Sequence, residues 1–389
     1  MTSTSPERLA QEVLDRCLAG DPPDRLPDAL IQDPTGKALF GILAEGLADR
    51  FEPALCEMYA RLFAPVVGGS VERYRRVRRP RPVRGDPRRV LVLSRVTLGA
   101  DVAVTSVVIA AARERFPKAQ IVFVGPAKNF ELFAADSRLQ HVPVSYQRRS
   151  LQDRLAVLGD LKALADDPDC LVVDPDSRLT QLGLLPIGDE DRYHLFESRA
   201  YGGASDRTLP ELAADWAAET FGIAGAKPYV AIPREEARFV TVSLGVGENP
   251  AKRIPDPFEE QLIAMLVATG AHLVIDKGAG GEEAARVERA VGKPTETLRF
   301  WDGSFAGFAR RIAASRLYVG YDSAGQHVAA ALGVPLITIF AGFPVPRMFE
   351  RWKPIGDQAT VLRVDRPDPH ETVERVRAVL SSDRALTGR

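Results

Sequence analysis

Two successive runs of short apolar segments alternate with segments of amphipathic, helical periodicity. The first run begins with the apolar segment Val90–Ser94 and extends to about residue 221, and the second extends from Phe239 to Phe340. A Gly/Pro-rich stretch, Gly222–Pro233, separates them. Alternating strands and helices are typical of a parallel sheet that helices cover on both faces. The pattern therefore predicts an α/β chain with two Rossmann-like domains facing a cleft.

The residues before these runs follow a different pattern. In the first 70 residues, apolar side chains recur at three- and four-residue spacing, which predicts helices. Over Arg73–Arg89 the chain turns strongly basic, with nine arginines and one acidic residue. Prolines interrupt this run, so we expect an extended linker. The predicted domains are a helical extension with an Arg/Pro-rich linker (1–88), an N-terminal Rossmann-like domain (89–225) and a C-terminal Rossmann-like domain (226–389).

The charge of Arg73–Arg89 is compatible with two roles. The run is either a solvated tether or a contact with phosphate-bearing lipid headgroups or an anionic acceptor. The whole chain carries 51 basic and 52 acidic residues, a net charge of −1, and no nucleic-acid motif accompanies the run. We therefore expect no nucleic-acid partner.

Cysteine usage and hydropathy bear on the compartment. Three cysteines, Cys17, Cys56 and Cys170, lie far apart without CxxC or Cys/His spacing, which argues against structural zinc and a disulfide framework. No stretch of 18 apolar residues occurs, and the N-terminus lacks the apolar core of a signal peptide. We expect reduced thiols in a cytoplasmic protein without a metal or cofactor. Peripheral contact with the inner membrane through Arg73–Arg89 stays open.

Ligands of parallel sheets bind outside the carboxyl ends of the strands, so the loops that follow strands are the candidates for chemistry. The first such loop, Ser94–Val102, carries Asp101 at a strand-to-helix turn. Asp101 could accept a proton from an acceptor hydroxyl as a general base. The alternative is a helix N-cap that accepts backbone N–H groups. The chain has no GxGxxG, so a dinucleotide fingerprint is not indicated.

The second loop is Leu244–Pro255. Its Gly245 and Gly247 permit close approach of a ligand to the backbone. Lys252 supplies a compact cation that suits a pyrophosphate oxygen, and it is one of nine lysines beside 42 arginines. A solvated loop lysine is the alternative. The Gly-Lys-Ser/Thr of a Walker A loop is missing.

The third loop, Gly320–Pro335, contains a small-residue turn and the start of an Ala-rich helix. The N–H groups of a first helical turn and the helix dipole favour an anion, and small side chains let it approach. The candidate anion-binding residues are Asp322, Ser323, Ala324, Gly325 and His327. Asp322 or Ser323 could instead be simple helix caps, and His327 a structural residue.

The fourth loop, Lys277–Glu283, places Glu282 and Glu283 at another helix start. A carboxylate there can accept hydrogen bonds from both hydroxyls of a ribose. The alternative is favourable negative charge at a helix N-terminus. The loops together predict one ligand, with its phosphates at Lys252 and residues 322–327 and its ribose at Glu282 or Glu283.

Four segments resemble motifs of one enzyme family. They are Tyr321–Phe340, Ala251–Pro255, Gly278–Glu283 and Leu98–Val102. In this order they are similar to Asp-Ser/Thr-Gly-x-x-His with Ala-Ala-Ala-Leu-Gly-x-Pro, to Lys-Arg-Trp-Pro, to a nucleoside-contacting Gly-x-x-x-Glu, and to Gly-Asp-Val. These are motifs of glycosyltransferase family 9, the ADP-heptose:lipopolysaccharide heptosyltransferases, and the resemblance runs from about Arg89 to the C-terminus. Two departures are Ala100, which splits the Gly-Asp pair, and Ala324, which replaces a Gly beside the phosphates.

The resemblance implies a GT-B fold, with the acceptor domain first and the nucleotide-sugar domain second. It also implies an inverting, metal-independent glycosyltransferase that moves a heptose-like sugar from a nucleotide-diphosphate donor to an acceptor hydroxyl. The acceptor would be a glycan or lipid-linked molecule in surface glycan or lipopolysaccharide synthesis. Asp101 would be the base, and Lys252 with the N–H groups of residues 323–325 would stabilise the departing diphosphate.

Two other functions stay open. One is a non-catalytic nucleotide-sugar-binding or scaffold protein, which the departures at Ala100 and Ala324 favour. The other is a different nucleotide-sugar enzyme on the same two-domain fold, such as a 2-epimerase.

Overall fold

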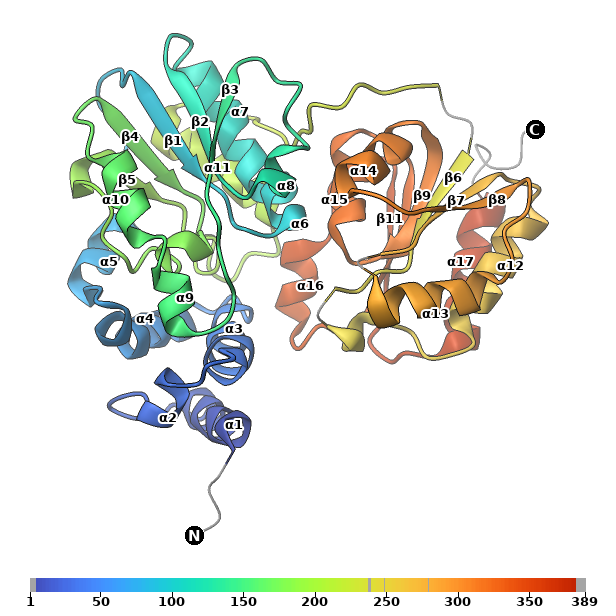
Figure 1. Cartoon of the computed structure of the whole chain (residues 1–389), viewed down its shortest axis with the longest axis horizontal. Helices are drawn as coiled ribbons and strands as arrows, with labels where there is room; N and C mark the ends of the chain where they lie inside the picture. The colour runs from blue at the N-terminus through green and yellow to red at the C-terminus, as the bar shows by residue number, and fades with distance from the viewer. Residues whose placement is uncertain (1–4, 237–238, 248, 279, 383–389) are drawn as a thin grey trace. The chain divides into compact units, whose positions relative to one another are not determined.

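The computed structural model describes residues 5–236, 239–247, 249–278 and 280–382. The chain forms two compact units (Figure 1). Unit 1 comprises the chain up to residue 130 together with residues 136–227, and unit 2 comprises residues 131–135 and the chain from residue 228 onward. Two loop positions that belong to the predicted sites, Glu248 and Ala279, lie outside the described residues.

Unit 1 contains a five-stranded parallel sheet in the order β3-β2-β1-β4-β5. Its strands are β1 (Arg89–Leu93), β2 (Gln120–Gly125), β3 (Leu139–Pro143), β4 (Cys170–Asp174) and β5 (Tyr193–Leu195). The central strands are Val/Leu/Ile-rich and buried on both faces, as parallel strands between helical layers must be. The alternating pattern predicted four of these strands, whereas β5 lies in a turn-rich stretch that carries no clear periodicity.

Helices cover this sheet. They are α6 (Leu98–Ala100), a π-helical turn (Asp101–Thr105), α7 (Ser106–Arg115), α8 (Ala127–Phe130), α9 (Leu151–Leu155), α10 (Leu158–Ala165) and α11 (Leu209–Phe221). Local sequence explains the limits of α11, which begins at a capping box formed by Thr208 and Glu211 and ends at Gly222 in the left-handed region. α7 packs against α11.

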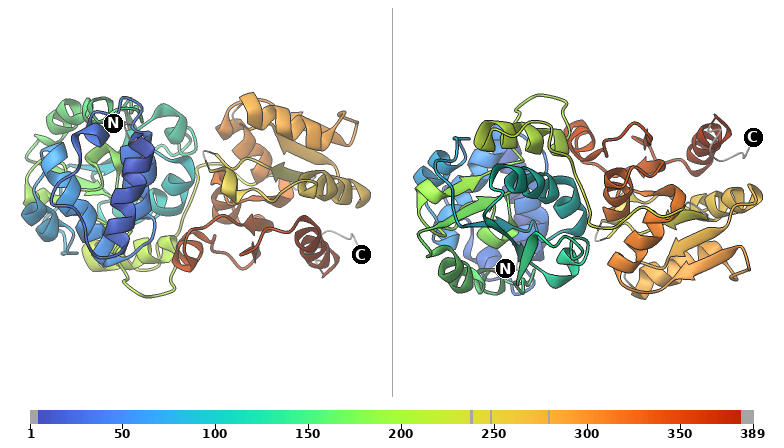
Figure 2. Two further views of the ribbon diagram at one scale, coloured as in Figure 1. Left: turned by 90° about the horizontal axis from the view of Figure 1, so that it is seen from below. Right: turned by 90° about the horizontal axis from the view of Figure 1, so that it is seen from above.

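The N-terminal helices belong to the same unit and cover one end of it (Figure 2). They are α1 (Pro6–Leu18), α2 (Asp28–Ile31), a π-helical segment (Lys37–Ala44), α3 (Glu45–Ala48), α4 (Pro53–Val67) and α5 (Val71–Val77). Their apolar faces share one continuous hydrophobic core with the sheet, which contains Leu43 and Phe63 from the helices and Leu91 and Val172 from the strands. The extension is therefore packed onto unit 1.

The prediction of an extended linker over Arg73–Arg89 is wrong for its first part, which forms α5. Arg73 is buried, lies 4.6 Å above the Tyr193 ring and donates to the carbonyl of Gly183. Arg78 forms an ion pair with Glu197 at 3.0 Å. Guanidinium groups of this run thus bind carbonyl and carboxylate groups elsewhere in unit 1, and these contacts hold the segment in place. Its contact with a membrane stays a prediction.

Unit 2 contains a six-stranded parallel sheet in the order β11-β10-β9-β6-β7-β8. Its strands are β6 (Phe239–Ser243), β7 (Leu273–Asp276), β8 (Leu298–Trp301), β9 (Ser315–Tyr321), β10 (Leu336–Phe340) and β11 (Ala359–Arg363). The chain winds outward from β6 in one direction to β8 and then in the other from β9 to β11. The strand order therefore reverses between β6 and β9, where ligands of such sheets bind.

Two groups of helices flank this sheet. They are α12 (Phe258–Ala268), α13 (Gly281–Val291), α14 (Phe305–Ala313), α15 (Ala324–Ala331), α16 (Pro346–Trp352) and α17 (Pro369–Ser382). α12 packs against α13 and α17, and these share one core with the strands, whereas α14 packs against α15. No helix in the described part of the chain combines the length and the apolar composition that crossing a membrane requires.

Candidate functional site

The predicted ligand-binding loops of the second domain meet at the carboxyl edge of the unit 2 sheet. β6 ends at Ser243, β7 at Asp276 and β9 at Tyr321, and each leads directly into one of these loops. Since β6 and β9 are neighbours, the loops after them flank the point at which the strand order reverses. The sheet topology therefore assembles one candidate site in unit 2.

Lys252 and the start of α15 are brought together. The Lys252 Nζ lies 2.6 Å from Asp322 Oδ2 and 3.4 Å from the Asp322 carbonyl oxygen. Lys252 ends a short 3₁₀ turn, Pro250–Lys252, and the Asn249 side chain accepts from the Ala251 N–H at 3.0 Å at the start of this turn. The ammonium group is therefore placed beside the first turn of a helix by a paired carboxylate.

Gly342, which follows β10, supports this loop, and the sequence reading missed it. Its backbone is left-handed (φ 68°), and a Cβ added there would overlap the carbonyl group of Ala251 and the backbone nitrogen of Lys252. The position thus needs glycine for its conformation and for its close approach to the loop. The signal in the sequence is a glycine shortly after a buried strand.

The start of α15 is open in the way an anion site requires. Ser323, the N-cap, has extended backbone and makes no side-chain cap hydrogen bond within the described residues. Asp322 is paired with Lys252, so neither residue is the simple cap that was the alternative. Ala324 and Gly325 form the first turn, and a Cβ at Gly325 would overlap the Tyr318 hydroxyl. The small residues therefore leave backbone N–H groups available.

His327 and Gln326 lie just inside the helix. His327 is buried, and burial lowers its pKa to about 4, so its imidazole is neutral at neutral pH. Its Nε2 lies 3.3 Å from the Gln326 Nε2. The Gln326 amide donates to Asp322 Oδ1. The signal in the sequence is the four-residue spacing of Asp322 and Gln326, which places two residues on the same face of a helix. Gln326 thus orients the carboxylate that holds Lys252.

The two glutamates of α13 have different surroundings. Glu283 accepts from the Val246 N–H at 3.3 Å, and a Cβ added at Gly245 would lie 3.2 Å from its Oε1. Its carboxylate therefore fills the space that Gly245 leaves and holds the loop after β6. Glu282 is exposed on the first turn of the helix. Gly247, in the same loop, has left-handed backbone (φ 60°).

Asp276 is a further carboxylate at this edge, and the sequence reading placed it only as the end of a strand. It accepts from the Gly278 N–H at 3.2 Å, and the Ser243 hydroxyl lies 3.5 Å from its Oδ2. Burial raises the pKa of Asp276 to about 6, with Glu283 adding to the effect. A polar residue at the last position of a parallel strand is the signal that could have identified it.

Asp101 lies in unit 1, at the loop after β1, and its side chain is fully buried. Its Oδ2 accepts from Ser94 Oγ and Asn129 Nδ2, both at 2.6 Å, and its Oδ1 accepts from the Arg95 N–H and Thr105 Oγ1, both at 2.7 Å. Burial raises the pKa of Asp101, and these hydrogen bonds oppose the increase. It begins a π-helical turn that continues α6. An acceptor hydroxyl would have to replace one of these four donors.

Residues 192–379 match the family model of glycosyltransferase family 9 (heptosyltransferase). No curated protein sequence matches the chain. Among solved structures, Escherichia coli heptosyltransferase WaaC with ADP is 17% identical and has a TM-score of 0.58, with 75% of this chain and 99% of that chain covered. Escherichia coli ADP-heptose lipopolysaccharide heptosyltransferase II is 19% identical with a TM-score of 0.52, covering 75% and 98%.

A family 9 glycosyltransferase from Veillonella parvula is also similar, with 16% identity and a TM-score of 0.55 over 76% of this chain and 89% of that chain. At these identities the likeness shows the fold, which is the two-domain α/β GT-B fold. The expected fold class is thereby confirmed.

Proposed function

This chain is a glycosyltransferase of family 9, and on that premise we propose that it transfers a heptose-like sugar from a nucleotide-diphosphate donor to a hydroxyl group of a glycan or lipid-linked acceptor. The match over residues 192–379 supports the reaction class. Solved structures of similar fold contain ADP and ADP-2-deoxy-2-fluoro heptose. Synthesis of lipopolysaccharide or another surface glycan is the proposed setting.

One observation carries the donor site: the Lys252 ammonium group lies at the start of α15, 2.6 Å from Asp322. We assign the diphosphate to this point, with the N–H groups of residues 323–325 and the His327 ring as donors. Charge that develops on the leaving diphosphate would be stabilised by donors already in position, each contributing about 3 kcal/mol in comparable sites. Gly245 and Gly247 would border the nucleotide, and Glu282 would accept from the ribose.

The acceptor hydroxyl would lose its proton to Asp101 as its oxygen attacks the anomeric carbon, and the diphosphate would leave from the opposite face with inversion. Asp101 follows the short helix α6, which begins after the loop of the central strand β1, near the carboxyl edge from which such sheets present reactive groups. Its raised pKa favours acceptance of a proton. The described residues contain no group of three or more His, Cys, Asp or Glu placed to hold a metal ion.

A panel of nucleotide sugars tests the donor assignment. Binding is measured by thermal unfolding of the full chain with ADP-heptose, ADP-glucose, UDP-glucose and GDP-mannose, each with and without EDTA. A ligand at 100 times its Kd adds about 2.7 kcal/mol to the stability of the state that binds it. We expect the ADP sugars to raise the melting temperature with or without EDTA. No shift with any nucleotide sugar would overturn the assignment.

A non-catalytic nucleotide-sugar-binding protein is the second candidate, because the Asp101 carboxylate is enclosed and already accepts four hydrogen bonds. Slow hydrolysis of the bound donor separates the two. An enzyme releases free sugar and nucleoside diphosphate from the donor in the absence of acceptor, whereas a binding protein returns the donor intact.

A further inference from the structure

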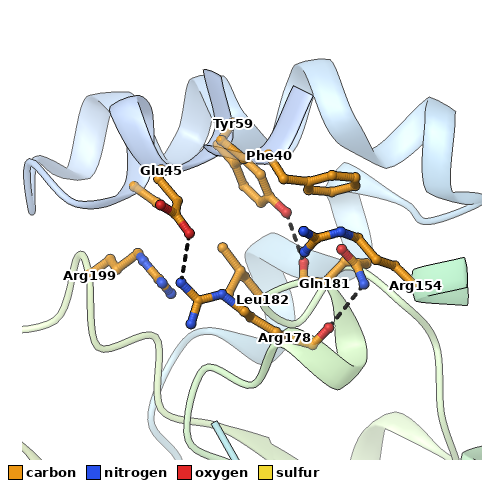
Figure 3. Close-up of a pocket in the computed structure, with 10 residues that line it drawn as sticks. Phe40, Glu45, Tyr59, Arg154, Arg178, Gln181, Leu182 and Arg199 are labelled. Carbon is orange, nitrogen blue, oxygen red and sulfur yellow. Dashed lines mark hydrogen bonds and ion pairs between the residues drawn. The ribbon is translucent and has the colours of Figure 1, made fainter. Parts of the chain in front are cut away.

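A pocket in unit 1 lies between the N-terminal helices and the carboxyl end of the sheet (Figure 3). About 330 Å³ of space between atoms lies within it, including space that is open to solvent. The helical side contributes Phe40, Ala44, Glu45, Ala48 and Tyr59. The sheet side contributes Arg154, Arg178, Gln181, Leu182 and Arg199. The pocket therefore exists only because the N-terminal helices pack onto this unit.

Among the lining residues, three guanidinium groups lie beside one carboxylate, that of Glu45. Outside the lining, the carboxylates of Asp176 and Asp49 pair with Arg199. Arg154 and Arg199 are buried, and Arg178 is partly exposed. Arg199 forms an ion pair with Asp176, in which its Nη1 lies 2.7 Å from Asp176 Oδ2. The Nη2 of Arg199 makes no hydrogen bond within the described residues. Arg154 is held by carbonyl groups and lies 3.8 Å above the Phe40 ring.

The guanidinium groups are close enough for their positive charges to repel one another. The pKa of Arg95, a neighbour of this cluster, is lowered to about 10, chiefly by burial. The charge of Asp176 opposes this decrease, and the charges of Arg199 and Arg178 contribute to it. Grouped cations are costly to bury, so such a cluster gains when a small anion lies among them.

Glu45 places a carboxylate in this pocket; burial raises its pKa, and the charges of Arg178 and Arg199 oppose the increase. Its Oε1 lies 3.0 Å from the Nη2 of Arg178, at the exposed side of the pocket. The same guanidinium group donates through Nη1 to Thr97, in the loop between β1 and Asp101. Arg178 thereby connects the pocket with the loop after the central strand.

We propose that this pocket is an anion-binding site that holds a carboxylate or phosphate group between Arg178 and Arg199, in competition with Glu45. The planar fork of an arginine matches both groups through paired hydrogen bonds. The anionic group is either part of the acceptor or a separate small molecule. The site belongs to unit 1 and does not depend on the donor assignment.

Binding is tested on the full chain by titration calorimetry with inorganic phosphate and with glucuronate, with glucose as the neutral comparison. The Lys252→Ala background removes the lysine of the proposed donor phosphate site. Arg178→Gln should weaken the binding of both anions at least tenfold. Glu45→Gln should tighten it several-fold, because the competing carboxylate is gone. Arg8→Gln, on an exposed face of α1, is the matched control and should leave affinity unchanged.

The opposite directions expected for Arg178→Gln and Glu45→Gln keep the test informative even where one variant folds poorly. The proposal is overturned when neither anion binds saturably, or when both variants bind as the parent does. Sugar-nucleotide binding is measured separately with Lys252 intact. Loss of that binding with anion binding retained would reject the donor assignment alone.

Kinetic measurements distinguish the two possible sources of the anion. When the acceptor carries it, Arg178→Gln raises the KM for a phosphorylated or acidic acceptor and leaves donor hydrolysis unchanged. When a separate ion binds, the variant loses anion affinity without a change in acceptor KM. Either outcome supports the site and identifies its occupant.

Discussion

At the scale of single residues, the proposed function depends on charged groups whose partners lie far away in sequence. Lys252 and Asp322 are 70 positions apart and form one ion pair. Asp101 gathers donors from the strand end, its own helix and α8. In both cases the paired groups orient the side chain and set its electrostatic environment, so a single substitution can test each proposed role.

Replacing Lys252 with alanine should raise the Kd of the nucleotide sugar about 10- to 100-fold. A hydrogen bond to a charged group is worth roughly 1.5–3 kcal/mol, which corresponds to this range. The measurement is calorimetric titration with the donor selected from the panel. Lys293→Ala, an exposed lysine of the same unit, is the control. Equal affinity in the two variants would remove the phosphate role of Lys252.

Replacing Asp101 with asparagine should reduce transfer at least 100-fold, the usual contribution of a general base, and leave donor affinity unchanged. The control is Thr105→Val, which removes one hydrogen bond to the carboxylate but keeps it as a base. Transfer rate and melting temperature are measured on both. A pure anchoring role predicts that both variants lose stability while the folded fraction of each retains its turnover.

Glu197 should make stability depend on pH. Burial raises the pKa of Glu197 to about 7, with Arg78 and the Tyr74 hydroxyl opposing this. The folded protein therefore binds more protons than the unfolded chain between about pH 4.5 and 7, and its free energy of unfolding falls as pH rises through that range. Relative to Glu197→Gln, the wild type should lose about 3 kcal/mol across it. Urea unfolding at several pH values measures the free energy of unfolding, with Glu12→Gln, at an exposed position, as the control. A difference between the wild type and Glu197→Gln that stays constant with pH would contradict the prediction.

At the scale of elements, the loops after β6, β7, β9 and β10 are held in place by one another. Glu283 of α13 binds the loop after β6, and Gly342 after β10 packs on the Lys252 turn. Tyr318 of β9 places its hydroxyl 3.4 Å from Ser323 Oγ, at the start of α15. The site is therefore a property of neighbouring strand ends and not of any one motif.

Gly342→Ala should weaken donor binding, because its methyl group must displace the Lys252 turn. Gly333→Ala is a matched control, since Gly333 has similar left-handed backbone (φ 65°) but no atoms near the added Cβ. Both variants should lose about 1–3 kcal/mol of stability from the backbone conformation. Only Gly342→Ala should also lose donor affinity. Equal donor affinity in the two variants would show that the turn is not positioned by this contact.

At the scale of the whole molecule, the chain forms two units that are built differently. Unit 2 is a sheet with its helices, whereas unit 1 also incorporates the N-terminal helices in its core. Because this core is continuous, the extension and the sheet of unit 1 should unfold together. The tryptophans allow a test, since Trp216 belongs to unit 1 and Trp301 and Trp352 to unit 2.

Leu43→Ala in the extension should destabilise the region around Trp216. Leu43 is fully buried, and loss of such a side chain costs about 2–5 kcal/mol. In a Trp301→Phe, Trp352→Phe background, fluorescence of Trp216 reports on unit 1 during urea unfolding. The midpoint should fall in the Leu43→Ala variant. An unchanged midpoint would show that the extension unfolds on its own. Leu18→Ala is the control, because Leu18 of α1 is 37% exposed whereas Leu43 is fully buried.

The sequence by itself determined most of the strands and helices of the two sheets, although not β5 or α5, and it determined the candidate loops. Local periodicity depends only on which face of a strand or helix is buried, so β1, β6 and α15 could be located before the structure was known. The family motifs likewise placed Lys252 and residues 322–327 in one site. The α/β class and the GT-B fold followed from these patterns and from the resemblance.

Tertiary structure alone decided which partners the charged groups have. The basic run at Arg73 suggested a solvated linker because a pattern of like charges does not reveal distant acceptors; in the fold, Gly183 and Glu197 supply them. Gly342 and Asp276 gained their roles only from neighbouring strand ends. The arginine pocket at Glu45 joins residues more than 130 positions apart. Burial and pairing depend on the whole packed chain, and no local segment encodes them.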